Sequence, residues 1–181
     1  MTPRRAVFLD RDGVLVEMVA SDRGDVAPLS LETFRIVDDA AATVARLREA
    51  GFLLILFTNQ PEVARGRLTP DTLAAMHVRL QVVAPLDDIL VCPHDDADQC
   101  ACRKPKPGML HAAAAKWNVD LRRSFVVGDR WRDIDAGRAA GCTTVLIDRP
   151  YSQCSTADAR VNDLREVVGV VLERAGRAAH V

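Results

Sequence analysis

The segment Ala6-Val7-Phe8-Leu9-Asp10-Arg11-Asp12-Gly13 gives the clearest indication of the fold class. Four apolar residues without a break are typical of a strand that is buried on both faces, as in a parallel sheet. Similar apolar runs recur at residues 52–57, 89–91, 125–127 and 143–147. Each run is followed by acidic, small or polar residues, so the chain turns where each run ends. The five runs together predict a parallel sheet.

Amphipathic segments lie between the predicted strands and carry signals for helix starts and stops. They cover residues 38–50, 69–84, 107–116, 133–140 and 163–175. Thr69-Pro70 opens the second helix, and Gly51, Gly141 and Gly176 follow three of the others. This alternation predicts an α/β fold with a doubly wound parallel sheet. Ligands of such sheets bind at the carboxyl ends of the strands.

Length and composition indicate a single globular domain over residues 1–181. Apolar residues make up 49% of the chain and charged residues 27%, and the formal net charge is −1. A near-neutral chain argues against a broad nucleic-acid surface. No apolar run approaches the length of a membrane span, and the N-terminus lacks the apolar segment of a signal peptide. We therefore expect a cytoplasmic protein with neither membrane nor nucleic acid as a partner.

Carboxylates gather where the predicted strands end. Asp10 and Asp12 are two positions apart in extended backbone, so both point to the same side. Asp129 follows another strand and can complete a set of hard oxygen ligands suited to Mg²⁺. A carboxylate can also attack phosphorus, while a second one acts as general acid and base. The pattern therefore predicts a Mg²⁺ site with the chemistry of phosphoryl transfer.

Phosphoryl transfer also needs donors and cations for the nonbridging oxygens. Thr58 supplies a hydroxyl at the end of the second apolar run. Arg103 and Lys104 supply positive charge, and Lys104 is one of only three lysines in the chain. Any one of these short motifs alone is a common turn or cap, but their occurrence in order at strand ends favours a catalytic site.

Four motifs carry a resemblance to a known family, and they read Phe8-Leu9-Asp10-Arg11-Asp12-Gly13-Val14, Phe57-Thr58-Asn59-Gln60, Cys102-Arg103-Lys104-Pro105 and Val127-Gly128-Asp129-Arg130-Trp131-Arg132-Asp133. They resemble the motifs of the haloacid dehalogenase superfamily of phosphatases. Within it, the chain is similar to the D-glycero-D-manno-heptose 1,7-bisphosphate phosphatases and to the histidinol-phosphate phosphatase domain. The likeness covers roughly residues 5–150. It implies a Rossmann-like domain without a large cap, followed by a C-terminal helical extension at about residues 160–176.

The resemblance also implies roles for the acidic residues. Asp10 would be the nucleophile, and Asp12 the general acid and base. Mg²⁺ would be held by Asp10, by the backbone carbonyl of Asp12 and by Asp129. Asp133, the second acid of the fourth motif, would either serve the metal shell or cap a helix.

The remaining motif residues would contact the substrate. Thr58 and Lys104 would stabilise the phosphoryl group. Asn59, Arg103 and Arg130 would bind the rest of the substrate, with Arg130 standing where the heptose enzymes usually have a lysine. The implied reaction is hydrolysis of a small sugar phosphate through an aspartyl-phosphate intermediate.

A cysteine and histidine cluster predicts a second metal. Cys92 and His94 are separated by five residues from the pair Cys100 and Cys102. Three thiolates and one imidazole form a closed tetrahedral site, which is typical of structural Zn²⁺. The same loop occurs in the families that the chain resembles. Because Cys102 directly precedes Arg103, the zinc would hold the loop that aims the site's cations.

Other cysteines and histidines are expected to have ordinary packing or surface roles. They are Cys142, Cys154, His77, His111 and His180.

Residues 15–30 and the pair Pro61-Glu62 depart from the heptose pattern, so the exact substrate stays open. We expect heptose 1,7-bisphosphate, with a preference for the bisphosphate over its monophosphate. Arg65, Arg67 or Arg103 would meet the second phosphate. Histidinol phosphate is the main alternative. A DNA 3′-phosphatase and a catalytically silent, zinc-stabilised binding module are two others. We expect a monomer or weak oligomer.

Overall fold

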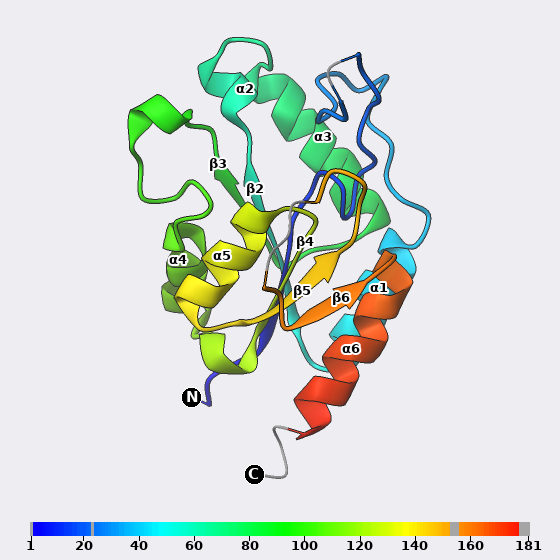
Figure 1. Ribbon diagram of the computed structural model, residues 1–181, viewed down its shortest axis with the longest axis vertical. Coiled ribbons are helices and arrows are strands. Elements are labelled where there is room, and N and C mark those ends of the chain that lie inside the picture. The colour runs from blue at the N-terminus through cyan, green and yellow to red at the C-terminus, as the bar shows by residue number, and fades with distance from the viewer. Residues whose placement is uncertain (1, 23, 153–155, 178–181) are drawn as a thin grey trace.

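The computed structural model describes residues 2–22, 24–152 and 156–177. One sheet of six strands crosses the molecule in the order β3-β2-β1-β4-β5-β6, and every neighbouring pair is parallel (Figure 1). The strands are β1 (Ala6–Leu9), β2 (Leu53–Asn59), β3 (Asp88–Cys92), β4 (Phe125–Gly128), β5 (Thr143–Ile147) and β6 (Ala159–Val161). The predicted doubly wound parallel sheet is confirmed.

Helices cover both faces of this sheet, which explains the unbroken apolar runs in the strands. They are α1 (Ala40–Glu49), α2 (Pro61–Ala64), α3 (Pro70–Val83), α4 (Gly108–Trp117), α5 (Trp131–Ala140) and α6 (Leu164–Arg177), with short 3₁₀ turns η1 (Asp96–Asp98) and η2 (Leu121–Arg123). Helices α1, α3 and α6 pack on one face, and α4 and α5 on the other.

Strand β1 shows how alternate residues supply the two halves of the core. Val7 and Leu9 join the cluster of α1, α3 and α6, whereas Ala6 and Phe8 join that of α4 and α5. Phe8 meets Phe57 of β2 edge to face, with ring centroids 6.3 Å apart. All four side chains of β1 are fully buried. The strand that carries Asp10 is therefore held firmly at the centre of the sheet.

Helix boundaries follow the predicted signals with two differences. Thr69 caps α3 through its side chain, and Gly141 closes α5 in a left-handed conformation, with a φ of 80°. Helix α5 begins at Trp131 rather than Asp133, because the Asp133 side chain caps the first turn. The prediction that Gly176 ends the last helix was wrong, since α6 continues to Arg177. A glycine in an exposed last turn costs only about 1 kcal/mol of helix stability.

Two excursions from the strands surround the carboxyl edge of the sheet. Residues 13–38 leave β1 and are joined by isolated bridges such as Val19 with Val26. Residues 93–107 leave β3 and carry the cysteine loop. The short strand β6, which sequence patterns did not reveal, extends the sheet beside β5, and α6 packs against α1. Among the described residues, no helix is long and apolar enough to cross a bilayer.

Candidate active site

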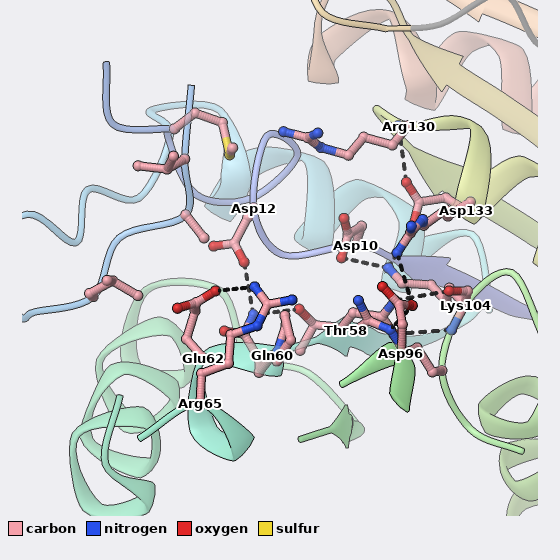
Figure 2. A pocket seen from close by; sticks show the side chains of 18 of the residues that line it. Asp10, Asp12, Thr58, Gln60, Glu62, Arg65, Asp96, Lys104, Arg130 and Asp133 are labelled. Carbon is pink, nitrogen blue, oxygen red and sulfur yellow. Dashed lines mark hydrogen bonds and ion pairs between the residues drawn. The ribbon is translucent and has the colours of Figure 1, made fainter. Parts of the chain in front are cut away.

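The motif residues meet at the carboxyl edge of the sheet, around a pocket of about 750 Å³ (Figure 2). Asp10 follows β1, Thr58 lies at the end of β2, and Asp129 follows β4. Lys104 reaches in from the loop after β3. The parallel direction of all strands brings these ends to one side. Segments far apart in the chain thus form a single site.

Lys104 is the centre of the charge arrangement. Its ammonium lies 2.8 Å from Asp10 Oδ1 and 2.6 Å from an Asp133 oxygen, and it donates to the Phe57 carbonyl. Only 4% of the lysine is exposed. Burial alone would lower the pKa of Lys104, but Asp10 and Asp133 outweigh it and raise that pKa above its ordinary value. The lysine therefore stays charged beside Asp10.

Three carboxylates offer oxygens within 4.8 Å of one another: those of Asp10, Asp129 and Asp133. Burial raises the pKa of Asp10 well above its ordinary value, partly offset by Lys104. Burial and the charge of Asp133 raise the pKa of Asp129 to about 6. Both buried Asp129 oxygens lack a hydrogen bond of good geometry, although the Tyr151 hydroxyl lies close by. A divalent cation would relieve this crowding, so the donor set fits Mg²⁺.

Gly13 allows the first motif to approach Asp129. A Cβ at this position would stand 2.1 Å from Asp129 Oδ2, and the residue has a φ of 85°. Any side chain would therefore collide with the carboxylate and strain the backbone. The glycine brings β1's turn against the fourth motif, where the carboxylates must meet.

Asp12 and Thr58 occupy the other side of the pocket. The Asp12 carboxylate lies against Arg11 and Gln60 instead of joining the three-carboxylate group, so only its backbone carbonyl remains as the expected metal ligand. Thr58 Oγ1 accepts a hydrogen bond of 2.8 Å from Gln60. Since the threonine oxygen accepts there, its own proton is free to be donated to a phosphoryl oxygen.

Asn59 lines the pocket but uses its amide on the neighbouring loop. It donates to the Lys104 carbonyl and accepts from the Lys104 N–H, both at 3.1 Å. This reciprocal pair fixes the backbone of Lys104 to the end of β2. The structure thus places Asn59, predicted as a substrate-binding residue, at a junction of the second and third motifs.

Three arginines line the pocket at different depths: Arg130 is exposed, Arg132 is half-buried and Arg103 is buried. Arg130 is 44% exposed at its side chain and stacks on the Tyr151 ring at 4.6 Å. Arg103 donates to Asp96 at 2.7 Å and to the His94 carbonyl. Arg132 lies 3.6 Å from the same Asp96 carboxylate. Anionic parts of a substrate that extend beyond the carboxylates would meet these three guanidinium groups.

Arg65 and Arg67 also line the pocket, but carboxylates already engage them. Arg65 forms a two-pronged contact with Asp95, at 2.6 and 2.7 Å, and a third bond to Glu62. Arg67 pairs with Glu62 as well. A role for these two arginines in binding a second phosphate stays a prediction, and it would require competition with those acids.

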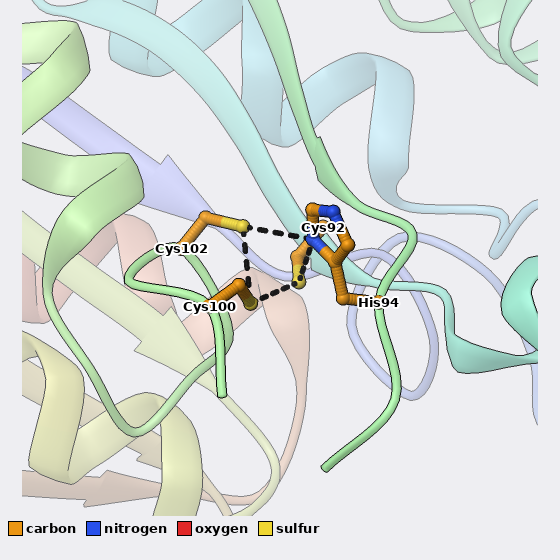
Figure 3. A group of neighbouring side chains, drawn as sticks. All are labelled: Cys92, His94, Cys100 and Cys102. Atoms are coloured by element: carbon orange, nitrogen blue, oxygen red, sulfur yellow. Dashed lines mark hydrogen bonds between the residues drawn. The ribbon is translucent and has the colours of Figure 1, made fainter. Parts of the chain in front are cut away.

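The four predicted zinc ligands come together in the loop after β3 (Figure 3). Cys92 Sγ lies 3.6 Å from both His94 Nδ1 and Cys100 Sγ. Cys102 Sγ lies 3.3 Å from His94 Nδ1 and 3.4 Å from Cys100 Sγ. Tetrahedral Zn²⁺ with bonds of about 2.3 Å to sulfur has edges of about 3.8 Å, so the cluster fits the ion.

The other cysteines and histidines are divided between the core and the helices. Cys142 is a free, buried thiol, His77 is half-buried on α3 and His111 is exposed on α4. Cys154 and His180 lie outside the described residues.

Several residues that line the pocket were not predicted from the sequence. Gln60, Asp96, Arg132 and Tyr151 all line the pocket. Gln60 stands next to the second motif and Arg132 within the fourth, so their proximity to strand ends was an available signal. Asp96 and Tyr151 reach the site only through the folding of loops, for which local sequence carries no pattern.

The fold and the site define the class of protein: a haloacid dehalogenase-like phosphatase. The HAD-hydrolase-like family model matches residues 101–166. The D-glycero-beta-D-manno-heptose-1,7-bisphosphate 7-phosphatase of Rhodopseudomonas palustris is 40% identical over 152 residues, covering 77% of this chain and 81% of its own. The corresponding protein of Bordetella bronchiseptica is 36% identical over 148 residues, covering 79% and 80%.

A solved structure agrees with these relatives. The D,D-heptose 1,7-bisphosphate phosphatase of B. bronchiseptica, crystallised with magnesium and phosphate, superposes with a TM-score of 0.80 and 32% identity. The match covers 94% of this chain and 99% of that one. The chain therefore belongs to the D,D-heptose 1,7-bisphosphate phosphatase family of the haloacid dehalogenase-like hydrolases, and it is an enzyme.

Proposed function

We propose that the protein hydrolyses the 7-phosphate of D-glycero-D-manno-heptose 1,7-bisphosphate. The supporting observation is a complete catalytic set at one sheet edge, with Asp10 beside Lys104 and Asp129, in a chain that matches 7-phosphatases along most of its length. The arginines that line the pocket support an anionic substrate with a second phosphate. The open pocket has room for a sugar of this size.

In the first step, a carboxylate oxygen of Asp10 attacks the phosphorus of the 7-phosphate. The bond between phosphorus and the sugar oxygen breaks, and a proton from Asp12 neutralises the departing alcohol. Lys104 and the Thr58 hydroxyl stabilise charge on the nonbridging oxygens. An aspartyl phosphate and the free 7-hydroxyl result.

In the second step, water attacks the aspartyl phosphate. Asp12 takes a proton from that water, the bond between phosphorus and Asp10 breaks, and inorganic phosphate leaves. Asp10 returns as a carboxylate and Asp12 as an acid, so the cycle balances. Lys104 keeps the Asp10 carboxylate paired before and after the reaction.

Two metals complete the proposal. Asp10, Asp129 and the backbone carbonyl of Asp12 would hold Mg²⁺, which supplies charge neutralisation for the phosphoryl group. Cys92, His94, Cys100 and Cys102 would hold a structural Zn²⁺. Their loop leads directly into Arg103 and Lys104, so the zinc would stabilise the positions of two site cations.

The distal phosphate at position 1 would be bound by Arg103 and Arg130. Arg103 lines the pocket and is held by Asp96 and the His94 carbonyl, so a phosphate bound there would compete with Asp96. Arg130 is exposed and supported by the Tyr151 ring. Guanidinium groups suit this task because they donate two parallel hydrogen bonds to phosphate.

Purified enzyme should be assayed with Mg²⁺ on heptose 1,7-bisphosphate, heptose 7-phosphate and histidinol phosphate. We expect the highest kcat/KM with the bisphosphate, and we expect the product to be the 1-phosphate. Asp10→Asn serves as the inactive control for contaminating phosphatases. If histidinol phosphate were the best of the three substrates, the heptose assignment would be wrong.

A further inference from the structure

Arg11 is a fully buried arginine inside the first motif. Its exposed fraction is 0%, and none of the proposed catalytic steps uses it. An arginine cannot shed its charge in a protein, so burying it is unfavourable unless partners replace the lost water. Its surroundings therefore indicate what the residue does.

The guanidinium of Arg11 forms a bidentate contact with the carboxylate of Asp12. Nε donates to Oδ1 at 2.9 Å and Nη2 donates to Oδ2 at 2.9 Å. Nη2 also donates to Gln60 Oε1 at 3.0 Å. The Phe34 ring lies under the guanidinium at 5.7 Å, and His77 Nε2 is 3.5 Å from Nη1. The orientation of the Arg11 guanidinium is thus fixed by contacts on several sides.

Gln60, which directly follows β2, contacts Asp12, Arg11 and Thr58 through its side-chain amide. Its Nε2 donates to Asp12 Oδ2 and to Thr58 Oγ1, both at 2.8 Å, and its Oε1 accepts from Arg11. Figure 2 shows Asp12, Gln60 and Thr58 together along one side of the pocket. One amide therefore sets the mutual placement of the general acid and a phosphoryl-binding hydroxyl.

The hydrogen bonds distinguish the two oxygens of Asp12. Oδ2 accepts from both Arg11 and Gln60, which uses its two lone pairs. Oδ1 accepts only from Arg11 Nε among the described contacts, so one lone pair remains. Since Asp12 lines the pocket, Oδ1 is the oxygen suited to carry the transferred proton.

We propose that Arg11 and Gln60 are positioning residues that orient the Asp12 carboxylate so that Oδ1 faces the leaving group. This inference rests on the proposed function, because it assigns the geometry of the acid in that reaction. Proton transfer needs the acid within hydrogen-bond reach of the leaving oxygen. A carboxylate free to rotate about its side-chain bonds would reach that geometry only part of the time.

The test compares leaving groups that differ in their need for a proton. Arg11→Met and Gln60→Met are assayed on heptose 1,7-bisphosphate, phenyl phosphate and p-nitrophenyl phosphate. Nitrophenolate departs without help from an acid, whereas the sugar alkoxide does not. We expect kcat/KM to fall about 10-fold to 100-fold on the heptose substrate and less than about threefold on p-nitrophenyl phosphate. Phenyl phosphate, similar in shape to the nitrophenyl ester, should be affected to an intermediate extent.

Two further variants separate geometry from charge and folding. Arg11→Lys keeps the positive charge but not the fork, so it should recover less than half of the lost activity. Arg5→Met removes another arginine that packs on a phenylalanine ring, at 4.5 Å from Phe52, at the far end of β1. It should leave all three substrates unaffected. Thermal unfolding of each variant reports its folding.

Equal losses on all three substrates would indicate a purely structural role for Arg11 and Gln60 and would overturn the proposal. Full recovery by Arg11→Lys would overturn the role of the two-pronged contact. Asp12→Asn tests the underlying reaction separately. If that variant kept wild-type activity on the heptose substrate, the proposed acid itself would be wrong, whatever Arg11 and Gln60 do.

Discussion

At the scale of single residues, Lys104 explains how the site tolerates buried acids. It contacts Asp10 and Asp133 at once, so a change at one acid leaves the lysine with the other as partner. Its backbone is held by Asn59 through two hydrogen bonds. The lysine is therefore fixed both at its main chain and at its charged end.

This sharing of one lysine predicts the behaviour of Asp10→Asn. Turnover should fall to about one-thousandth or less, because the amide cannot form the acyl phosphate. The fold should persist, since Lys104 keeps Asp133 at 2.6 Å and a buried charge is removed. Phosphate release and thermal unfolding measure the two effects. A variant with wild-type turnover would refute the assignment of the nucleophile.

Arg103→Ala should weaken the preference for a bisphosphorylated substrate. Loss of one charged contact worth about 1.5–3 kcal/mol lowers kcat/KM for heptose 1,7-bisphosphate by roughly tenfold or more. The effect on heptose 7-phosphate should be smaller, because it lacks the distal phosphate. Arg48→Ala is the control, since Arg48 pairs with Asp87 and does not line the pocket. Equal losses on both substrates would argue against distal-phosphate binding by Arg103.

His77 should make stability depend on pH. Burial, followed by the charge of Arg11, lowers the pKa of His77 to about 4. Below pH 6.5 His77 therefore binds a proton in the unfolded chain but stays neutral in the folded chain until the pH approaches 4. The contribution of His77 to the free energy of unfolding is complete above pH 6.5 and is lost as the pH falls toward 4, by about 2 kcal/mol after allowance for partial exposure.

The comparison that isolates this effect uses His77→Gln. Denaturant unfolding at pH 7 and at pH 4.5 gives the free energy of unfolding for both proteins. The difference in free energy of unfolding between the wild type and the variant should be smaller at pH 4.5 than at pH 7. The carboxylates titrate in both proteins, so their effect cancels in this difference. An unchanged difference between the two proteins would contradict the lowered pKa.

At the scale of elements, the loop after β3 is the unit that delivers cations to the site. Residues 93–107 contain three of the four clustered ligands, and Cys92 ends the strand itself. Arg65 ties α2 to this loop through Asp95, and Arg103 pairs with Asp96 within the loop. Cys100 and Cys102 pack against the hydrophobic core, and a metal bound between the four ligands would hold the loop further.

Replacement of one clustered ligand should therefore affect two measurements together. Cys100→Ser is expected to reduce the zinc content from about one ion per chain, and kcat/KM should fall about tenfold or more. Cys142→Ser, which changes a buried thiol outside the cluster, should keep its zinc. Metal analysis and phosphate release provide the two readouts. Wild-type protein without bound zinc would contradict the metal assignment.

At the scale of the whole molecule, folding brings several carboxylates close together at the carboxyl edge of the sheet, where their negative charges repel one another. Asp10, Asp129 and Asp133 converge there from strand ends and from α5, with Lys104 as their shared buried cation. An acid whose pKa is raised by folding makes the folded protein less stable as the pH increases through that pKa. At pH 8 the metal-free protein therefore carries an unfavourable Asp129 charge.

Mg²⁺ should consequently stabilise the folded chain. At a concentration of one hundred times its Kd, the gain is about 2.7 kcal/mol. Asp129→Asn should unfold at a higher temperature than the wild type in EDTA at pH 8, and it should lose the response to Mg²⁺. Thermal unfolding with and without Mg²⁺ measures both. A variant that responded to Mg²⁺ as the wild type does would exclude Asp129 as a ligand.

Much of the molecule was predictable from local pattern. The unbroken apolar runs predicted five strands because both faces of a parallel sheet are buried. Thr69 and Gly141 predicted helix ends because caps act over a few residues. Strand β6 and helix α2 were missed because three or four residues hold too little periodicity, and β6 is specified by its pairing with β5.

The residue types that follow the strands already indicate the chemistry, since they supply carboxylates, a hydroxyl, a lysine, three thiols and an imidazole. Which of these groups contact one another depends on the three-dimensional fold. Folding brings Asp133 to Lys104, the Asp12 side chain to Gln60, and Arg65 to Asp95. The physical reason is that a buried charge must find its partner in three dimensions, and partners distant in the chain leave no local pattern.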